Sequence, residues 1–468
     1  MIAMTKSHQL DTDPIRSLFF KYYFPALISI LSVTVHQIIN GVILAYAVGK
    51  EGVAAIGLFA PILTVFIAFG LSLMIGGGIL IAKNIGAQNY DRVQQIFQFT
   101  TTMVLLIGGI VAFSAPFITR PLANFLAGTE NTAVVSNTSA YMFWGFIWLP
   151  FFLVRMLWGN FLSNAKNPRI SRNATLIAVA LNIILDVLLV IVIPLGVAGA
   201  SIATGISVVI SLFYLFFFIR NAKGHFSFKN FEFTLMLKDW RELISFGIPS
   251  LVSEISFAIG LLLINKNLLP YGSLAISAFG LVNYLSFIFP RLFTASMVAM
   301  LPIISFNIGA RLPARALEIF KFSILFTLYL GIVVFVIGLM FPLFLVNIFS
   351  GEESEEFKEL AQNAITLYFA LFIAAGPNYI LSAYFQSIGK SALSISINLL
   401  KGAGFVVGFL FLFEYLKTGL NGIWLIRAFS EMATLLLIGF YTLYKRENYY
   451  AAEIILKSNK TETMPKTL

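Results

Sequence analysis

The chain contains no cysteine and carries little charge. The absence of cysteine among its 468 residues excludes disulfides, thiolate metal sites and thiol nucleophiles. Three histidines leave little for a histidine-rich metal site. Charged residues make up 11% and hydrophobic residues 59%, whereas an ordinary soluble domain is roughly 25% charged. A soluble protein this apolar could not cover its surface with polar side chains, but a lipid-facing one does not need to. The sequence therefore predicts an integral membrane protein.

Long apolar runs recur along the chain, separated by short polar segments. Each is long enough to cross roughly 30 Å of hydrocarbon, and the first twenty residues are too polar for a cleavable signal. The runs 53–82 and 273–306 are interrupted by Gly or Pro, which predicts bent or tilted helices. We predict an all-α membrane protein with about twelve spans near 22–48, 53–82, 97–119, 139–162, 173–194, 197–219, 243–268, 273–306, 319–349, 362–388, 392–416 and 420–444.

The second half of the chain repeats the first. NIGAQNYDRVQQIF at 84–97 matches NIGARLPARALEIF at 307–320 at seven of fourteen positions, 223 residues later. Pro25 recurs as Pro249 at an offset of 224, and Gly196 as Gly419 at 223. Because each half has six spans, the two are parallel repeats, and a cavity is expected between them. The predicted domains are an N-terminal arm 1–21, an N-lobe 22–219, a linker 220–242, a C-lobe 243–444 and a tail 445–468.

The basic residues predict the orientation of the chain in the membrane. The N-terminal arm, the tail and the alternate loops hold 22 of the 31 Lys and Arg residues, and the opposite loops hold four. Since positive loops stay in the cytosol, both termini and the linker are predicted to be cytosolic in a multi-pass plasma (inner) membrane protein. The net charge of +10 then reflects topology, and no nucleic-acid partner is expected.

Several motifs resemble one transporter family. NPR at 167–169, LNIILD at 181–186 and GVAGASIAT at 196–204 are similar to the pattern around the fifth and sixth helices of the multidrug and toxic compound extrusion (MATE) family. NIGA at 84–87 and GIW at 422–424 resemble family patterns in the two lobes. The resemblance covers nearly the whole chain and extends loosely to the related lipid and polysaccharide flippases. It implies a V-shaped pair of six-helix bundles that exports drugs or metabolites, driven by inward proton or sodium flow.

Asp186 is the leading candidate among the acidic residues inside predicted spans. An ionisable residue at membrane depth is costly and by default marks an ion or substrate route. A desolvated carboxyl there can take and release a proton, and Asn182 lies four residues earlier on the same helix face. The family resemblance implies that Asp186, Asn182 and Thr204 form an N-lobe cation site. A role in hydrogen bonding between helices is the alternative for Asp186.

The first span departs from the family pattern. Many members have an aspartate in a segment resembling VHQIING at 35–41, where this chain has Asn40. The site then has one formal charge instead of two carboxylates. His36, one helical turn earlier, offers a second titratable group, with a packing role as its alternative. Protons are therefore the expected coupling ion; the alternative is sodium bound by Asp186, Asn182, Thr204 and Asn40. No other metal and no cofactor is expected.

Other charged residues inside spans have more than one interpretation. Glu254, early in the seventh span, is a candidate to face a substrate cavity; the alternative is a position at the end of the helix that water reaches. Arg155 and Arg291 could bind anionic substrate groups, but snorkelling to an interface is the alternative. Arg427 and Glu431 are spaced i, i+4 and are predicted to form a buried structural ion pair.

The favoured function is secondary active efflux of amphiphilic small molecules, cations among them, by a monomer that alternates its access. A lipid-linked precursor flippase of the same fold group is the alternative, favoured by the cations inside spans, which are Arg155, Lys266, Arg291, Lys401 and Arg427. An intramembrane enzyme would need a convergent nucleophile, base or metal set, and a channel an evident filter; we find neither pattern. The glycine run 76–78 lacks the Lys and Ser/Thr of a P-loop, which favours helix packing over ATP binding.

Overall fold

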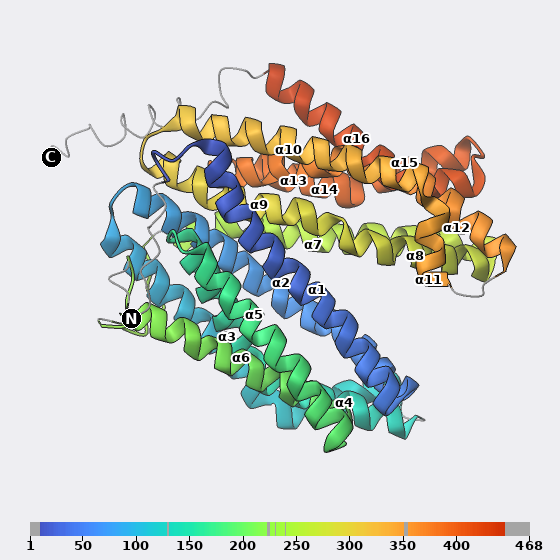
Figure 1. Ribbon diagram of the computed structural model, residues 1–468, viewed down its shortest axis with the longest axis horizontal. Coiled ribbons are helices and arrows are strands. Elements are labelled where there is room, and N and C mark those ends of the chain that lie inside the picture. Colours follow the sequence, from blue (N-terminus) through green and yellow to red (C-terminus); the bar gives the residue numbers. More distant parts are fainter. Residues whose placement is uncertain are drawn as a thin grey trace. The chain divides into compact units, whose positions relative to one another are not determined.

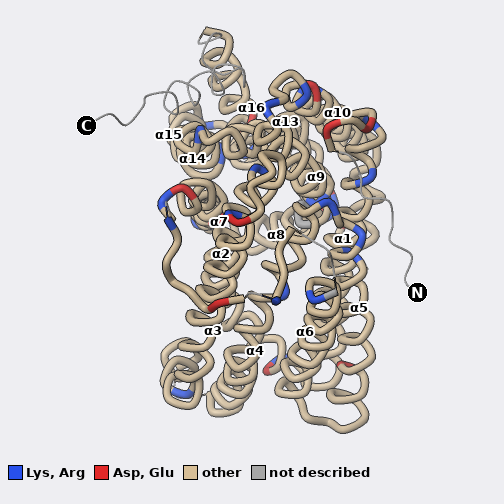
Figure 2. Tube along the Cα trace, turned by 90° about the vertical axis from the view of Figure 1, so that its left-hand side faces the viewer, with Lys and Arg blue, Asp and Glu red and all other residues tan. Residues whose placement is uncertain are grey.

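The structure is a computed structural model that describes residues 10–128, 131–221, 225–229, 231–238, 240–350 and 354–444. These residues form helices joined by short turns and contain no β-strand. The prediction of an all-α membrane protein is confirmed. The predicted tail 445–468 and the first nine residues of the predicted arm lie outside the described residues. In Figure 2 most of the trace is uncharged, and Lys, Arg, Asp and Glu colour only short segments.

Ten helical stretches of the described chain are long and apolar enough to cross a membrane, or eleven when the bent pair α12–α13 is counted. One of them, Trp240–Gly309, is 70 residues long. At about 1.5 Å per residue it far exceeds the roughly 30 Å of a single crossing. It holds the two predicted spans 243–268 and 273–306. Counting it as two crossings gives the twelve that the sequence predicts.

The first repeat consists of long helices. They are α1 (Ile15–Val48), α2 (Lys50–Gly86), α3 (Tyr90–Ala127), α4 (Thr132–Asn164), α5 (Pro168–Asp186) with the π-helix η1 (Val187–Val192), and α6 (Gly196–Asn221). Asn89 and Asn131 begin α3 and α4, and each side chain accepts a hydrogen bond from the first turn of its helix. α1 begins seven residues before the predicted start of the first span at 22.

The second repeat has a counterpart for each helix about 223 residues later. Its elements are α7 (Trp240–Leu268) with the 3₁₀ turn η2 (Leu269–Tyr271), α8 (Gly272–Ile288), α9 (Pro290–Gly309), α10 (Pro313–Met340), α11 (Pro342–Ser350), α12 (Glu355–Tyr368), α13 (Leu371–Ser387), α14 (Ser391–Leu399), the π-helix η3 (Leu400–Gly404), α15 (Phe405–Tyr415) and α16 (Gly419–Tyr444). For example, α4 covers 132–164, and α12 with α13 covers 355–387.

Three spans predicted as single runs are each two helices, which corrects the sequence reading. The run 273–306 divides into α8 and α9, 319–349 into α10 and α11, and 362–388 into α12 and α13, which are bent by 41°. Pro290 and Pro342 begin two of the new helices. Proline suits the first position of a helix because the N–H that it lacks has no intrahelical partner there. The division at Pro290 lies within the run 273–306, for which the sequence predicts a bent or tilted helix.

The turns repeat as regularly as the helices. Left-handed backbone conformations, which favour glycine, occur at Gly49 and Gly272, at Gln88 and Arg311, at Lys166 and Gly389, and at Gly196 and Gly419. Each of these pairs is separated by 223 residues. The turn after α2 is closed by a 2.9 Å hydrogen bond from Asn89 N to Asn84 O, and its copy by a 2.8 Å bond from Leu312 N to Asn307 O. The backbone thus repeats even where the side chains differ.

The chain forms two compact units. The first contains Ile28–Gly247, and the second contains Gln9–Leu27 together with Ile248–Leu468, as far as these are described. In the first unit α4 contacts α2, α3, α5 and α6, and in the second α13 contacts α9, α10, α14 and α16 (Figure 1). The two central helices are therefore counterparts in the repeat. The first 13 residues of α1 belong to the second unit and the rest to the first.

The glycine run 76–78 packs helices together, as predicted. A Cβ atom at Gly76 would lie 2.4 Å from the backbone oxygen of Leu243, and one at Gly77 would lie 2.7 Å from the Phe161 ring. A Cβ atom at Gly78 would lie 2.3 Å from the Asn160 side chain. All three distances are shorter than van der Waals contact, and at Gly76 the obstacle is backbone, which cannot move aside as a side chain can.

Candidate functional site

A polar group surrounds Asp186 inside the first unit. Asp186 is the last residue of α5, where the helix passes into the π-helix η1, and it is fully buried. Its Oδ1 atom has no hydrogen-bond partner among the described residues. A buried oxygen without a partner is costly, and π-helical segments are frequent at functional sites. This position is therefore suited to bind a proton or a cation.

Asn182 links Asp186 to two other helices. With its amide oxygen facing His36 on α1, its nitrogen donates to Thr204 Oγ1 on α6 at 3.2 Å. With the amide turned over, its nitrogen donates to His36 Nε2 and, at 2.8 Å, to Asp186 Oδ2. Its oxygen then accepts from the backbone N–H of Thr204 at 2.9 Å and from Thr204 Oγ1 at 3.2 Å. The second orientation is the better one for a neutral His36, because it satisfies both amide hydrogens.

Asn40 joins this group through Tyr141. The Tyr141 hydroxyl on α4 interacts with the Asn40 side chain and electrostatically with Asp186. Asn40 Oδ1 is buried and has no hydrogen-bond partner in the described part of the chain. The structure thus brings together all five residues proposed from the sequence for ion coupling: Asp186, Asn182, Asn40, Thr204 and His36.

An apolar cluster borders the polar group on the side of η1. Val190 lies one turn beyond Asp186 and is buried against Ile43, Leu44, Val197 and Ala200. Because these side chains offer no hydrogen bond, this boundary keeps water and polar ligands from the Asp186 carboxyl on that side.

The site contains a single carboxylate. Within the described residues, no group of three or more His, Cys, Asp or Glu side chains could hold a metal ion. A sodium ion would depend on Asp186 and the neutral oxygens of Asn182, Thr204 and Asn40. A proton needs only the Asp186 carboxyl, whose hydrogen bond from Asn182 depends on the orientation of the amide.

The residues proposed for a substrate cavity lie in different units. Arg155 is on α4 in the first unit, where its Nε atom has no partner among the described residues. Glu254 on α7 and Arg291 on α9 are in the second unit and interact electrostatically. Glu254 is exposed and Arg291 is half-buried.

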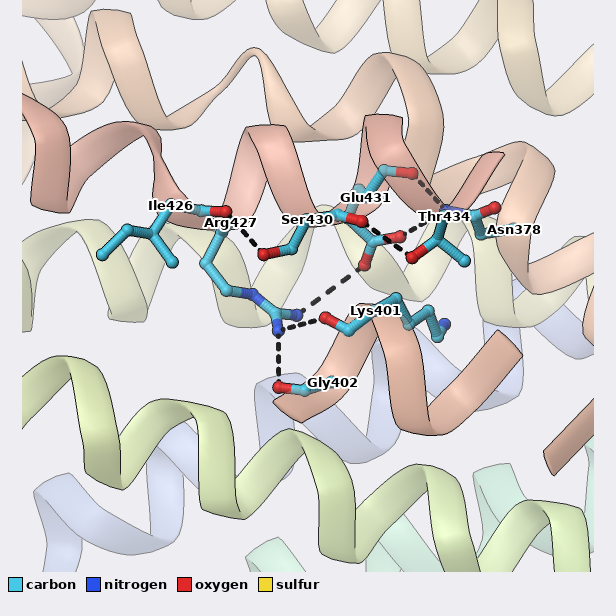
Figure 3. A network of polar contacts seen from close by, with 8 residues as sticks. All are labelled: Asn378, Lys401, Gly402, Ile426, Arg427, Ser430, Glu431 and Thr434. Atoms are coloured by element: carbon cyan, nitrogen blue, oxygen red, sulfur yellow. Dashed lines mark hydrogen bonds and ion pairs between the residues drawn. The ribbon is translucent and has the colours of Figure 1, made fainter. Parts of the chain in front are cut away.

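Arg427 and Glu431 lie at the centre of a buried network in the second unit (Figure 3). Arg427 Nη2 is 3.7 Å from Glu431 Oε1, and Nη1 donates to the carbonyl of Lys401 at 3.1 Å. Asn378 Nδ2 donates to Glu431 Oε2 at 2.7 Å. The pair therefore ties α16 to α13 and to the carbonyl groups of η3.

Sequence reasoning did not assign two of the residues found here. Tyr141 carries no charge and lies on a helix far from Asp186 in the sequence, so no local signal marks it. Lys401 was weighed only as one cation in favour of a flippase. Its position in the middle of an apolar span was a usable signal, because charged residues there are rare.

Comparison with known proteins identifies relatives across the whole chain. The sequence model of the MatE family matches twice, at residues 25–188 and 249–412. The two matches begin at Pro25 and Pro249, and this offset confirms that the chain is built from two repeats.

Individual relatives agree with that match. The multidrug export protein MepA of Staphylococcus saprophyticus is 27% identical over 402 residues, which cover 85% of this chain and 87% of that protein. MepA of Staphylococcus aureus is 25% identical over 454 residues, covering 96% and 98%. A solved outward-facing MATE multidrug resistance transporter of the MOP superfamily superposes with a TM-score of 0.86 at 19% identity, covering 96% of this chain and 99% of that one. A MOP superfamily transporter from Pyrococcus furiosus has a TM-score of 0.87 at 19% identity, with the same coverage.

Proposed function

This chain belongs to the MATE family of multi-pass membrane transporters, and we propose that it exports amphiphilic drugs from the cell in exchange for protons. The relatives that match most of its length are named multidrug export proteins. The proposed exporter acts as a monomer in the cell membrane, with both termini in the cytosol. A transporter family gives no support to the intramembrane enzyme considered from the sequence.

The observation that carries the proposal is the Asp186 carboxyl, fully buried with one oxygen atom unpartnered. A charged carboxylate in this position lacks the hydrogen bonds that water would supply, whereas a protonated carboxyl needs fewer. The charged carboxylate is therefore stabilised by polar, hydrated surroundings, and the protonated carboxyl by dry ones. This difference is what a transporter needs if one ion is to favour one of its two conformations.

Asn182 provides the link between that proton and the neighbouring helices. When His36 is neutral at Nε2, the amide nitrogen donates both to His36 and to Asp186. When Nε2 carries a proton, it donates to the amide oxygen, and the amide nitrogen turns toward Thr204. Asp186 then loses this hydrogen bond, while the nearby imidazolium charge favours its carboxylate form. The protonation states of His36 on α1 and Asp186 on α5 are thereby coupled through Asn182.

Asn40 favours protons over sodium in this mechanism. Sodium binds several hard oxygen ligands, and carboxylates attract it most strongly. The site supplies one carboxylate, and Asn40 contributes only a neutral amide, which interacts with Tyr141. Asp186 and His36 can both bind and release protons, and neither needs a metal ion to do so.

The test is export from vesicles that contain the purified protein. An imposed proton gradient in sodium-free buffer should drive export of a cationic dye, and a sodium gradient at matched pH should not. Asp186→Asn should abolish the proton-driven export, while Asp91→Asn, a change on the exposed first turn of α3, should leave it unchanged. Export that runs only on sodium contradicts the proton assignment, and the absence of any dye export contradicts the drug exporter.

A further inference from the structure

The fifth span of each repeat carries one buried charge, and the two charges have opposite signs. In the first repeat this span is Pro168–Val192 and in the second it is Ser391–Tyr415, both 25 residues long. Asp186 lies beside the π-helix η1, and Lys401 lies within the π-helix η3. At the offset of 223, the residue of the second repeat that corresponds to Asp186 is Phe409, so the second repeat has no carboxyl at that position. The buried ammonium group of the second repeat, that of Lys401, lies eight residues before Phe409.

Lys401 is buried and lies far from the ends of its span. It is 6% exposed, and ten residues separate it from the start of its span, a distance of about 15 Å along a helix. A lysine side chain is too short to reach the interface from there, so snorkelling does not account for this residue. A buried charge away from any interface calls for a partner of opposite sign.

Among the described residues, the ammonium group of Lys401 lies against an aromatic ring. Its Nζ lies 4.0 Å from the centre of the Tyr379 ring. Figure 3 shows the side chain extending away from the Arg427–Glu431 pair, and only its backbone oxygen is joined to that pair. In the described part of the chain no carboxylate lies within ion-pair distance of Nζ. This cation–π contact attracts the ammonium group to the ring but does not neutralise its charge.

The neighbouring charges leave an excess of one positive charge. Arg427 is paired with Glu431, and Glu254 interacts electrostatically with Arg291 and Lys401. Three cations thus face two carboxylates. A singly charged anionic group beside Lys401 would balance the cluster, whereas a dianion would overcompensate it.

The cluster is most exposed on the side of α7. Glu254 is exposed, Tyr379 is half-buried and Lys401 is buried, so exposure decreases from α7 toward η3. Phe257, also on α7, is 47% exposed, and its ring lies 5.0 Å from the Arg427 guanidinium group. An amphiphile could place its apolar part on this ring and its anionic group toward Lys401.

We propose that Lys401 binds the carboxylate of exported molecules, with Arg427 and Arg291 supporting its charge and Tyr379 holding its ammonium group. This inference rests on the proposed export function and adds amphiphiles that carry a carboxylate to its substrates. The second unit then recognises the anionic group of the cargo, while the first unit binds the coupling proton.

Two dyes that differ only at the carboxyl group test the proposal. Rhodamine 110 has a free carboxylate, and rhodamine 123 is its methyl ester. Binding to the purified protein in detergent, measured by fluorescence anisotropy, should be about tenfold or more tighter for rhodamine 110, as for other charge-assisted contacts. Lys401→Met should remove this preference and leave the affinity for the ester unchanged. Lys401→Arg should retain it, and Lys417→Met, at an exposed loop lysine, should behave as the parent.

Each other outcome overturns the assignment. Equal binding of the two dyes by the parent contradicts the carboxylate site and leaves the export proposal intact, whereas a parent that binds neither dye contradicts both. A Lys401→Met variant that keeps the preference excludes Lys401 as the group that binds the carboxylate. If phosphatidylglycerol added to the micelles removes the preference, the site belongs to a lipid phosphodiester and the substrate assignment is wrong.

Discussion

Individual buried charges in this protein are held by very different numbers of partners. Asp186 has one amide donor and an unpartnered oxygen. Glu431, which is equally buried, is held by Arg427 and by two hydrogen bonds that tie Asn378 to its carboxylate and its backbone oxygen. A group with few partners can change its protonation state at low cost, while a fully paired group fixes the structure around it. This contrast separates the proposed coupling residue from the structural pair.

Replacing Arg427 by Met should destabilise the protein strongly. It leaves Glu431 buried without its cation, a loss of about 3–5 kcal/mol for buried pairs. Two carbonyl groups of η3, those of Lys401 and Gly402, also lose their donor. Adding Glu431→Gln should recover part of the loss, so a double-mutant cycle of unfolding free energies should give a coupling of about 0.5–3 kcal/mol. Strictly additive effects would show that the two residues are not paired.

The sequence predicts the helices well because their signal is local. Apolar runs and a fixed offset locate the spans, and the positions of Pro290 and Pro342 explain where single runs divide. Asp186, Asn182 and Thr204 were found because they lie in recognisable motifs. Tyr141 and the π-helix η3 were not predicted, because they depend on contacts between distant segments. The carbonyl groups of η3 bind Arg427, which lies 25 residues or more along the chain.

At the scale of helices, α2 offers a direct test of close packing. A Cβ atom at Gly76 would lie 2.4 Å from the Leu243 backbone oxygen, whereas nothing lies within 4 Å of one at Gly57. Gly76→Ala should therefore cost about 1–3 kcal/mol of unfolding free energy through overpacking. Gly57→Ala, in the same helix, should be neutral or stabilising by up to about 1 kcal/mol. Similar thermal unfolding midpoints for both variants would contradict the packing described here.

The segment that follows α6 is docked on α3 and should respond to pH. The His225 ring stacks on Tyr90, with 5.0 Å between centres, and Gln94 exchanges two hydrogen bonds with the backbone of Ser227. Burial, and then the charge of Lys166, hold the pKa of His225 below its ordinary value of 6.5. His225 therefore binds a proton less readily when the segment is docked than when it is undocked. Protonation of His225 favours the undocked segment, so docking should weaken as the pH falls below 6.5.

A spin label tests this response. A label at Lys229→Cys, in a chain without other cysteines, should become more mobile as the pH is lowered through 6.5. His225→Phe keeps the stacked ring without its titration, and should abolish the response. Equal mobility changes in the two proteins would assign the effect to another group.

At the scale of the whole molecule, the repeat and the basic residues together predict a topology. Ser227, between the two repeats, should be cytosolic, and Ser354, at the start of α12, should be external. Single cysteines at these positions should be labelled by a membrane-impermeant reagent from opposite sides of oriented vesicles. Labelling of both from one side would contradict the orientation and the count of twelve spans.

The central claim is that Asp186 carries the proton exchanged for the substrate. The most direct measurement is proton release when a cationic dye binds to the purified protein in weakly buffered, sodium-free detergent solution. Linkage requires that a substrate competing with the proton displaces it, so the parent should release about one proton per bound dye near neutral pH. Asp186→Asn should bind the dye without releasing a proton. Undiminished release by Asp186→Asn would contradict this account.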